Sequence, residues 1–418
     1  MWRLALADRK GKNVRRLLQG LMPAQRTTVE KPRLLFIDNL RILLIALVIM
    51  LHLSVTYGGA GSWYYKEGRP DAISFVVLSW HNGASQAFFM GFLFMISGYF
   101  TPASYDRKGP RRFLIDRLLR FGIPLLCYDF IINPALVYLL IRADVIKVEG
   151  SFSQLLVRYF KEPHVGTGPL WFVEALLIFA VAYVLWRLFI KHLPRVKRGA
   201  KYLACGFTAG LSPIPGNMTI ALVAFALGAV TFAVRIWLPI GWAFEPLNLQ
   251  FPFFPQYICF FIIGIIAYRG DWFTRIPKAA GRFWLSIAVI FIVVLFPVLF
   301  VLGGAPTGNV SQFAGGAHWQ CLAYSVWEQF VGVAMIVALL VLFRERLNHQ
   351  GAVAKAASAS TYTAYIIHAP VIVLLALALR NVRLYPLLKF SLVAAVAAPI
   401  CFALGNFIRK LPPAKRIL

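Results

Sequence analysis

One face of the first long apolar segment carries the residues best suited to chemistry. Asp38, Arg41 and His52 follow helical spacing over residues 34–56 and therefore lie along one stripe. Arg41 and His52 are separated by about three turns, or roughly 16 Å. A histidine exchanges protons near neutral pH, and an arginine held by an aspartate binds anions. The stripe predicts an acid–base histidine and an anion-binding arginine, although an interfacial Asp–Arg anchor with a helix-bonded histidine would have the same spacing.

A second basic cluster precedes the third apolar segment. It contains Arg112, Arg117 and Arg120, of which the last two are three residues apart and share a helix face. The planar fork of arginine matches phosphate oxygens, so the cluster predicts a cradle for a nucleotide-like head group. A basic loop on the inner side of a membrane has the same composition.

Four further ionisable residues interrupt apolar segments: His81, Glu174, Glu328 and His368. Because such a group in a bilayer costs roughly 2.5 kcal/mol or more, each indicates a site, a water path or an internally bonded packing contact. These alternatives stay open. The histidines are dispersed and the five cysteines form no CxxC pair, so no metal site is expected.

The composition indicates that these residues belong to a membrane protein. Of 418 residues, 60% are hydrophobic and 14% are charged, and the mean hydropathy is +0.71, which excludes a soluble enzyme, a disordered regulator and a collagen-like fibre. We expect an all-α, polytopic bundle of about ten transmembrane helices. The predicted spans are residues 34–56, 78–100, 121–141, 169–190, 219–240, 253–269, 283–303, 319–343, 360–380 and 386–408.

The distribution of charge predicts that both termini are cytoplasmic. This arrangement puts 33 of the 43 Lys and Arg residues on the inner side, so the net charge of +27 requires no nucleic acid. The chain then divides into a basic cytoplasmic segment 1–33, a membrane domain 34–410 and a cytoplasmic tail 411–418. Residues 201–218 are interpreted as an inner connection. The segment 1–33 lacks the apolar core of a signal peptide and either lies on anionic membrane lipids or is disordered.

Five motifs in order resemble those of the acyltransferase-3 family of multi-span membrane acyltransferases. The pair Arg41 and His52 matches the family's Arg-x10-His signature. Residues 52–57 and 97–100 look most similar to its glucan biosynthesis protein C branch, which is associated with succinylation of periplasmic glucans. The motifs are DNLR at 38–41 followed by His52, FMISGYF at 94–100, RLLRFGIP at 117–124, PLWF at 169–172 and STYTAYIIH at 360–368.

The resemblance implies an O-acyltransferase in a bacterial inner membrane, which moves an acetyl or succinyl group from cytoplasmic acyl-CoA to a carbohydrate or glycan-type acceptor at the outer face. His52 matches the catalytic histidine, Arg41 its partner, and Arg117 with Arg120 the donor-binding motif. His368 matches a recurring late histidine. Acyl-CoA would be a co-substrate, with no tightly bound cofactor. A secondary transporter or flippase is the alternative, because buried ionisable residues also mark transport paths.

The sequence leaves several features of this reading open. Both the acyl group and the acceptor hydroxyl are undetermined, as is the oligomeric state. His52 would act either as a general base or as a covalent acyl carrier. No inverted repeat supports the transporter alternative, and no nucleotide-binding loop indicates an ATP-driven pump.

Overall fold

The computed structural model describes residues 33–147, 151–161, 167–192, 213–412 and 414–417. The basic segment 1–33 and the connection 201–218 therefore lie largely outside the described residues. The described part consists of helices and loops without a β-strand, and residues 35–418 form one compact unit. The predicted all-α fold is confirmed.

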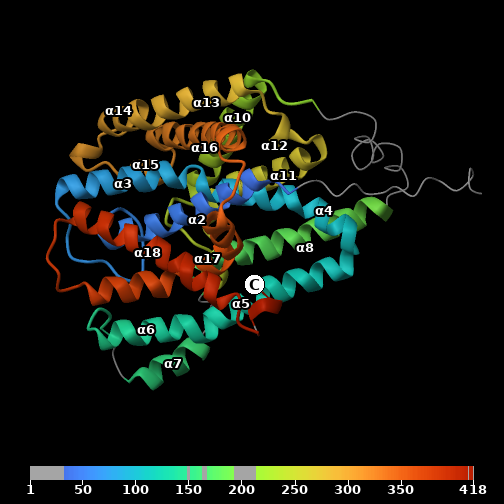
Figure 1. The fold of residues 1–418 in the computed structure, drawn as a ribbon. Helices are drawn as coiled ribbons and strands as arrows, with labels where there is room; N and C mark the ends of the chain where they lie inside the picture. Colours follow the sequence, from blue (N-terminus) through green and yellow to red (C-terminus); the bar gives the residue numbers. More distant parts are fainter. Residues whose placement is uncertain (1–32, 148–150, 162–166, 193–212, 413, 418) are drawn as a thin grey trace, which may run out of the picture. The chain divides into compact units, whose positions relative to one another are not determined.

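The helices are shown in Figure 1. They are α2 (Leu35–Thr56), α3 (Ala72–Gln86), α4 (Phe89–Arg117), α5 (Ile123–Cys127), α6 (Asn133–Arg142), α7 (Phe152–Lys161), α8 (Trp171–His192), α10 (Asn217–Trp237), α11 (Phe254–Gly270), α12 (Trp272–Arg275), α13 (Lys278–Ile290), α14 (Phe296–Leu302), α15 (Ser311–Ala314), α16 (Trp319–Arg346), α17 (Ala352–Ala378) and α18 (Pro386–Ile408). Three π-helical turns join some of them: η1 (Leu118–Gly122), η2 (Tyr128–Ile132) and η6 (Phe291–Leu295). The 3₁₀ turns are η3 (Gly168–Leu170), η4 (Glu245–Leu247), η5 (Phe251–Phe253), η7 (Ala305–Thr307) and η8 (Ala414–Arg416).

Nine helical stretches of the described chain are long and apolar enough to cross a membrane. The longest, Ala72–Arg142, has 71 residues and contains two of the predicted spans. Gly109 divides it, because its backbone adopts φ 73° and ψ 169°, and Figure 1 shows the chain turning back between α4 and α5. Large apolar side chains such as Trp237 (76% exposed) and Leu302 (72%) face outward, which suits contact with lipid rather than water. The chain is a polytopic membrane protein.

Local chemistry explains how individual helices begin and pack. Asp71 caps α3, since its carboxylate accepts the backbone N–H of Ser74 at 3.0 Å, and hydrogen bonds from Ser74 lower the pKa of Asp71.

Helices α4 and α11 cross in backbone contact at two glycines. A Cβ on Gly98 would lie 2.1 Å from the carbonyl oxygen of Phe261, and one on Gly264 would lie equally close to that of Met95. Gly98 of the second motif and Gly264 of α11 are therefore packing positions.

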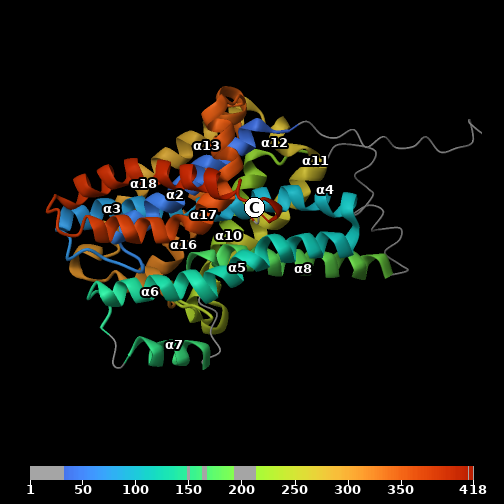
Figure 2. The ribbon, with the colours of Figure 1, turned by 60° about the horizontal axis from the view of Figure 1, so that its bottom comes forward.

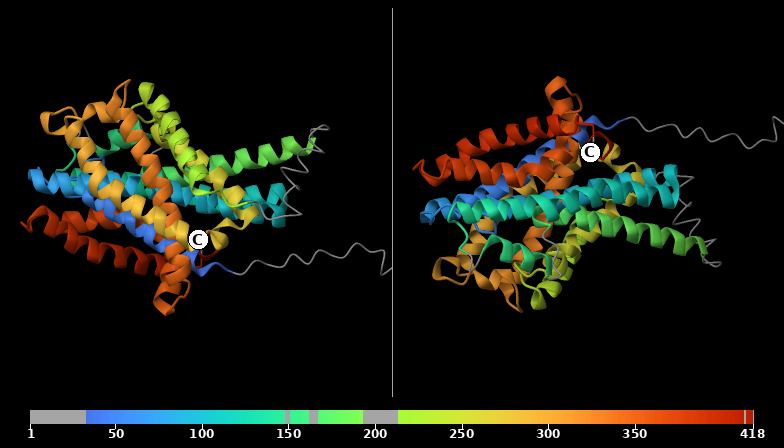
Figure 3. Two further views of the ribbon diagram at one scale, coloured as in Figure 1. Left: turned by 90° about the horizontal axis from the view of Figure 1, so that it is seen from above. Right: turned by 90° about the horizontal axis from the view of Figure 1, so that it is seen from below.

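Loops that the charge pattern predicts on the inner side contact one another. The Asn39 amide donates to the carbonyls of Leu347 and His349 at 2.6 and 3.0 Å, at the start of α2. Arg187 bonds Asp106 at 2.9 Å where α4 and α8 run alongside each other (Figure 3). These contacts gather one set of helix ends. The expected outer loops also meet, since Arg380 donates to the Ala143 carbonyl at 2.9 Å.

Helix α17 occupies a central place for the site. It packs against α2 and α18, and α2 also packs against α16 (Figures 1 and 2). Its buried face begins at Ser358 and continues through Thr361, Tyr365 and His368. The motif at 360–368 thus faces the helix that carries the first motif.

Candidate active site

A cavity of about 460 Å³ lies among α2, α4, α8, α11, α17 and η1. Its charged lining contains five cations and one carboxylate: Arg41, Arg107, Lys108, Asp116, Arg117 and Arg120. The lining therefore includes three of the four arginines expected to bind an anionic donor. Arg112 does not line the cavity and is exposed on α4. The excess of positive charge suits a ligand that carries several phosphates.

Arg41 is held from two helices. Its Nη1 lies 3.7 Å from Asp38 Oδ1 one turn earlier on α2, which confirms the expected pairing. Its Nη2 donates to Thr361 Oγ1 at 3.1 Å, across the contact with α17. Thr361 Oγ1 in turn donates to the Ser358 carbonyl at 3.0 Å, so this hydroxyl is oriented to accept from the guanidinium. The two contacts fix Arg41 at the rim of the cavity.

Aromatic rings support the other two arginines. The guanidinium of Arg117 lies 5.1 Å from the ring centroid of Phe113 and 5.2 Å from that of Phe121. Arg120 lies 5.5 Å from the ring of Tyr362, whose hydroxyl donates to the Arg120 carbonyl at 2.7 Å. Arg120 belongs to the π-helical turn η1, and such turns are frequent at functional sites. A guanidinium supported by the face of a ring keeps its N–H donors available for an anionic ligand.

The two predicted histidines lie beside each other farther along α2 and α17. The ring centroids of His52 and His368 are 5.2 Å apart with planes at 21°. His368 is fully buried and its Nδ1 contacts the Tyr365 carbonyl, so Nδ1 carries the proton and Nε2 presents a lone pair. Neither His52 Nδ1 nor His368 Nε2 has a hydrogen-bond partner in the described part of the chain. Two neighbouring imidazole rings thus each have one buried nitrogen without a partner among the described residues.

Tyr365 borders both the cavity and the histidine pair. It lines the cavity, its ring centroid lies 5.5 Å from that of His368, and its hydroxyl donates to the Pro169 carbonyl. The fourth motif thereby contacts the fifth. Tyr365 therefore contacts both the basic cavity and the histidine pair.

The remaining predicted residues lie elsewhere. His81 on α3 faces Phe390 of α18, with ring centroids 6.0 Å apart. Glu174 is buried in the first turn of α8, beside Thr167. Neither residue lines the cavity.

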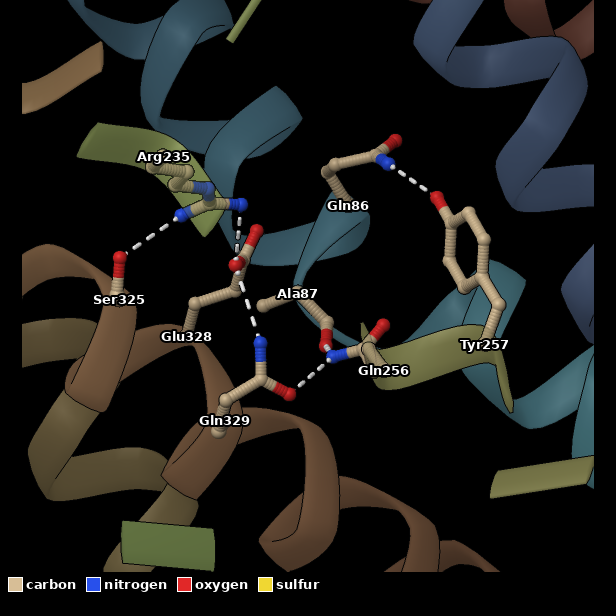
Figure 4. Close-up of polar contacts among 8 residues, drawn as sticks. All are labelled: Gln86, Ala87, Arg235, Gln256, Tyr257, Ser325, Glu328 and Gln329. Atoms are coloured by element: carbon tan, nitrogen blue, oxygen red, sulfur yellow. Dashed lines mark hydrogen bonds and ion pairs between the residues drawn. The ribbon is translucent and has the colours of Figure 1, made fainter. Parts of the chain in front are cut away.

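Glu328 belongs to a buried polar network away from the histidines (Figure 4). Its Oε2 accepts from Arg235 Nη2 at 2.7 Å, and both side chains are almost completely buried. Gln329 bonds the same carboxylate at 3.2 Å, and Gln256 bridges from Gln329 to the Ala87 carbonyl at 3.0 and 2.8 Å. Because Ala87 lies where α3 gives way to α4, the network satisfies a carbonyl freed by that break. Glu328 is a packing group in this arrangement.

Sequence reasoning missed several residues of the site. Thr361 and Tyr365 precede the predicted His368 at i, i+4 and i+7 spacing, a helical stripe that could have placed them on one face with it. Arg107 and Lys108 looked like ordinary loop bases. Nothing in the order of residues indicated that they would line the cavity.

Comparisons with known proteins agree with this arrangement. The family model described as an acyltransferase domain, Acyl_transf_3, matches residues 34–406. The chain belongs to the acyltransferase-3 family. It is similar to "Glucans biosynthesis protein C" of Salmonella heidelberg (strain SL476) and of Salmonella schwarzengrund (strain CVM19633), at 25% identity over 358 residues in each case. These matches cover 82% of this chain and 83% of each relative. No solved structure matches.

Membership of the acyltransferase-3 family establishes transfer of an acyl group other than an aminoacyl group as the activity class. The chain is therefore a membrane acyltransferase, and the transporter alternative gives way. The matched residues include all five motifs, from Arg41 to His368.

Proposed function

We propose that this acyltransferase moves an acetyl or succinyl group from acyl-CoA, held in the basic cavity, to a hydroxyl of a glycan-type acceptor at the opposite end of α2. One arrangement carries the proposal: Arg41 and His52 lie at two levels of α2, and α17 contacts both through Thr361 and His368. The phosphates would bind the arginines at the inner side, and the pantetheine arm would carry the thioester inward.

The reaction balances with His52 as general base. The imidazole takes the proton of the acceptor hydroxyl while the oxygen attacks the thioester carbonyl. The C–S bond then breaks, the acyl group stays on the oxygen as an ester, and the proton passes from His52 to the departing thiolate. His368 Nδ1 donates to the Tyr365 carbonyl, and this contact orients the His368 ring beside His52.

Transfer by wild-type protein in inside-out bacterial inner-membrane vesicles tests the proposal. The donors are radiolabelled acetyl-CoA and succinyl-CoA, and the acceptor is a glucan oligosaccharide enclosed in the lumen, a choice that follows the names of the relatives. His52→Ala should lower kcat about 100-fold or more. Arg41→Ala should raise the KM for the donor about tenfold or more.

Matched variants control for general damage. His318→Ala removes an exposed histidine outside the cavity, and Arg282→Ala removes an exposed arginine at the same end of the molecule as Arg41. Both should transfer label at the wild-type rate. Unchanged transfer by His52→Ala, with the controls active, contradicts the proposed mechanism.

A further inference from the structure

A tryptophan of the loop that follows α2 lies against the imidazole of His52. Trp63 belongs to the loop 57–71 between α2 and α3, and its ring centroid is 3.7 Å from that of His52, with planes at 17°. This is full van der Waals stacking of an indole on an imidazole. The ring centroid of Trp63 is 6.0 Å from that of His368 and 5.2 Å from that of Tyr64, whose plane is nearly perpendicular to it. The face of His52 is therefore covered by a residue of a loop.

The middle of this loop is anchored beside Trp63. The hydroxyl of Tyr64 donates to Asn133 Oδ1 at 2.7 Å and lies 3.1 Å from the hydroxyl of Tyr128. Burial raises the pKa of Tyr64 to about 12, so it remains a neutral donor at physiological pH. Gly168 is required next to this cluster, because a Cβ there would lie 2.4 Å from the Tyr64 hydroxyl and its φ is +48°.

An ion pair pins the far end of the loop to α18. Lys389 is 2% exposed, and its ammonium contacts Glu67 and donates to the carbonyls of Leu379 and Val382 at 2.8 and 2.9 Å. All three ammonium donors are thereby used. The backbone N–H of Glu67 donates to the Thr56 carbonyl at 2.8 Å, which ties the same residue to the end of α2. Burying a lysine costs free energy even when all of its donors are bonded, so this contact indicates that the loop is held in one position.

We propose that Trp63 is a positioning residue for His52 and that the Lys389–Glu67 ion pair holds Trp63 in place. The inference rests on the proposed role of His52 as the base. A general base acts only when its nitrogen is within hydrogen-bond reach of the hydroxyl, and a misplacement of about 1 Å costs about 100-fold in rate. The indole of Trp63 covers one face of the half-buried His52, and the ring of His368 lies beside it. The indole face also stabilises the imidazolium that forms when His52 takes the proton.

Kinetics of Trp63 variants test the positioning role. Trp63→Leu should lower kcat about 100-fold while the KM for acyl-CoA stays within twofold, because the donor cavity contains no part of the loop. Trp63→Phe retains an aromatic face and should recover most of kcat. If Trp63→Leu has the wild-type kcat while His52→Ala, assayed in parallel, is inactive, the inference is overturned and the proposed function still stands.

Variants of the ion pair test the anchor. The double variant Lys389→Met/Glu67→Gln removes both charges, so no unpaired charge remains buried. It should lower kcat, and adding Trp63→Leu should cause less loss than the product of the two separate effects, because both act through one stack. Full multiplicative loss contradicts the anchor. Tyr385→Phe is the matched control, since its hydroxyl bonds Asp71 at the start of α3 and does not contact Glu67 or Lys389.

A chemical readout separates this inference from the proposed function. Diethyl pyrocarbonate modifies accessible imidazole nitrogens, and mass spectrometry follows its reaction with His52 without requiring activity. Modification of His52 should be faster in Trp63→Leu and in the double variant than in wild type or Tyr385→Phe. Equal rates in all four proteins show that Trp63 does not cover His52, whatever His52 does in the reaction.

Discussion

Thr361 is the side chain through which α17 contacts Arg41. Its hydroxyl accepts from Nη2 at 3.1 Å, on the rim of the cavity. Thr361→Val retains the branched shape and removes this acceptor, so Arg41 should lose its hydrogen bond to α17. We expect the KM for acyl-CoA to rise about tenfold with kcat nearly unchanged, because a hydrogen bond to a charged group contributes about 1.5 kcal/mol and His52 lies farther along the helix.

Steady-state kinetics at varied acyl-CoA concentration measure this change in KM. Two further substitutions serve as controls. Thr361→Ser restores the hydroxyl and should restore the KM. Thr363→Val changes a buried threonine on the same helix that does not line the cavity, and it should have the wild-type KM. A raised KM in Thr363→Val, or none in Thr361→Val, contradicts the role of the hydroxyl.

Residue spacing predicted contacts within one helix and failed between segments. The Asp38–Arg41 pair follows from i, i+3 spacing and is confirmed. The stack of Trp63 on His52 does not follow, because the intervening loop contains glycines at positive φ, including Gly58 and Gly61, and no periodicity fixes such a path.

At the scale of elements, the motif at 360–368 is the part that joins the others. Its members contact Arg41 of α2, Arg120 of η1 and Pro169 before α8. The order of motifs in the sequence could be recognised, but their convergence on α17 could not, since the contacting residues are hundreds of positions apart in the chain. The π-helical turn η1 was also beyond prediction, because it depends on Tyr362 bonding the Arg120 carbonyl.

The buried network around Glu328 predicts a stability effect. Glu328→Gln leaves the Arg235 guanidinium buried without its carboxylate, and breaking such a pair costs about 3–5 kcal/mol. We expect a clear fall in the thermal unfolding midpoint of the purified protein. Replacing both residues, Arg235→Met/Glu328→Met, should recover most of the loss because no charge then remains buried.

An exposed ion pair supplies the comparison for this effect. Lys278 and Glu345 lie 2.5 Å apart at the surface, and Lys278→Met should leave the midpoint unchanged because water and salt screen exposed pairs. If Glu328→Gln unfolds at the wild-type temperature, the network does not stabilise the junction of α3 and α4. If the double replacement is as unstable as the single one, packing rather than an unpaired charge is responsible.

At the scale of the whole molecule, composition was sufficient for the membrane fold and incomplete for the charges. Each predicted span lies at least in part within the nine apolar stretches of the described chain. Arg235 and Lys389, however, were counted among the bases of the outer side. Both are buried within helices and paired with Glu328 and Glu67, respectively. A count of basic residues cannot distinguish a solvated base from one that has a distant carboxylate partner.

The orientation of the molecule yields the last prediction. The cavity with Arg41 lies at the end where the expected inner loops meet, whereas the loop with Trp63 lies at the other. Single cysteines at the exposed positions Lys66 and Gly351, in a background without the five native cysteines, mark these two ends. In intact cells a membrane-impermeant maleimide should label Lys66→Cys and spare Gly351→Cys.

Inside-out vesicles should reverse the labelling and serve as the internal control. The reason is the positive-inside rule, because the charge pattern assigns 33 of the 43 basic residues to the same side as Gly351. Labelling of Gly351→Cys in intact cells would mean that the basic cavity faces away from the cytoplasm. Since acyl-CoA is a cytoplasmic donor, that result would overturn the proposed direction of transfer even if His52 proved essential, and the cavity would then have to bind a different anion.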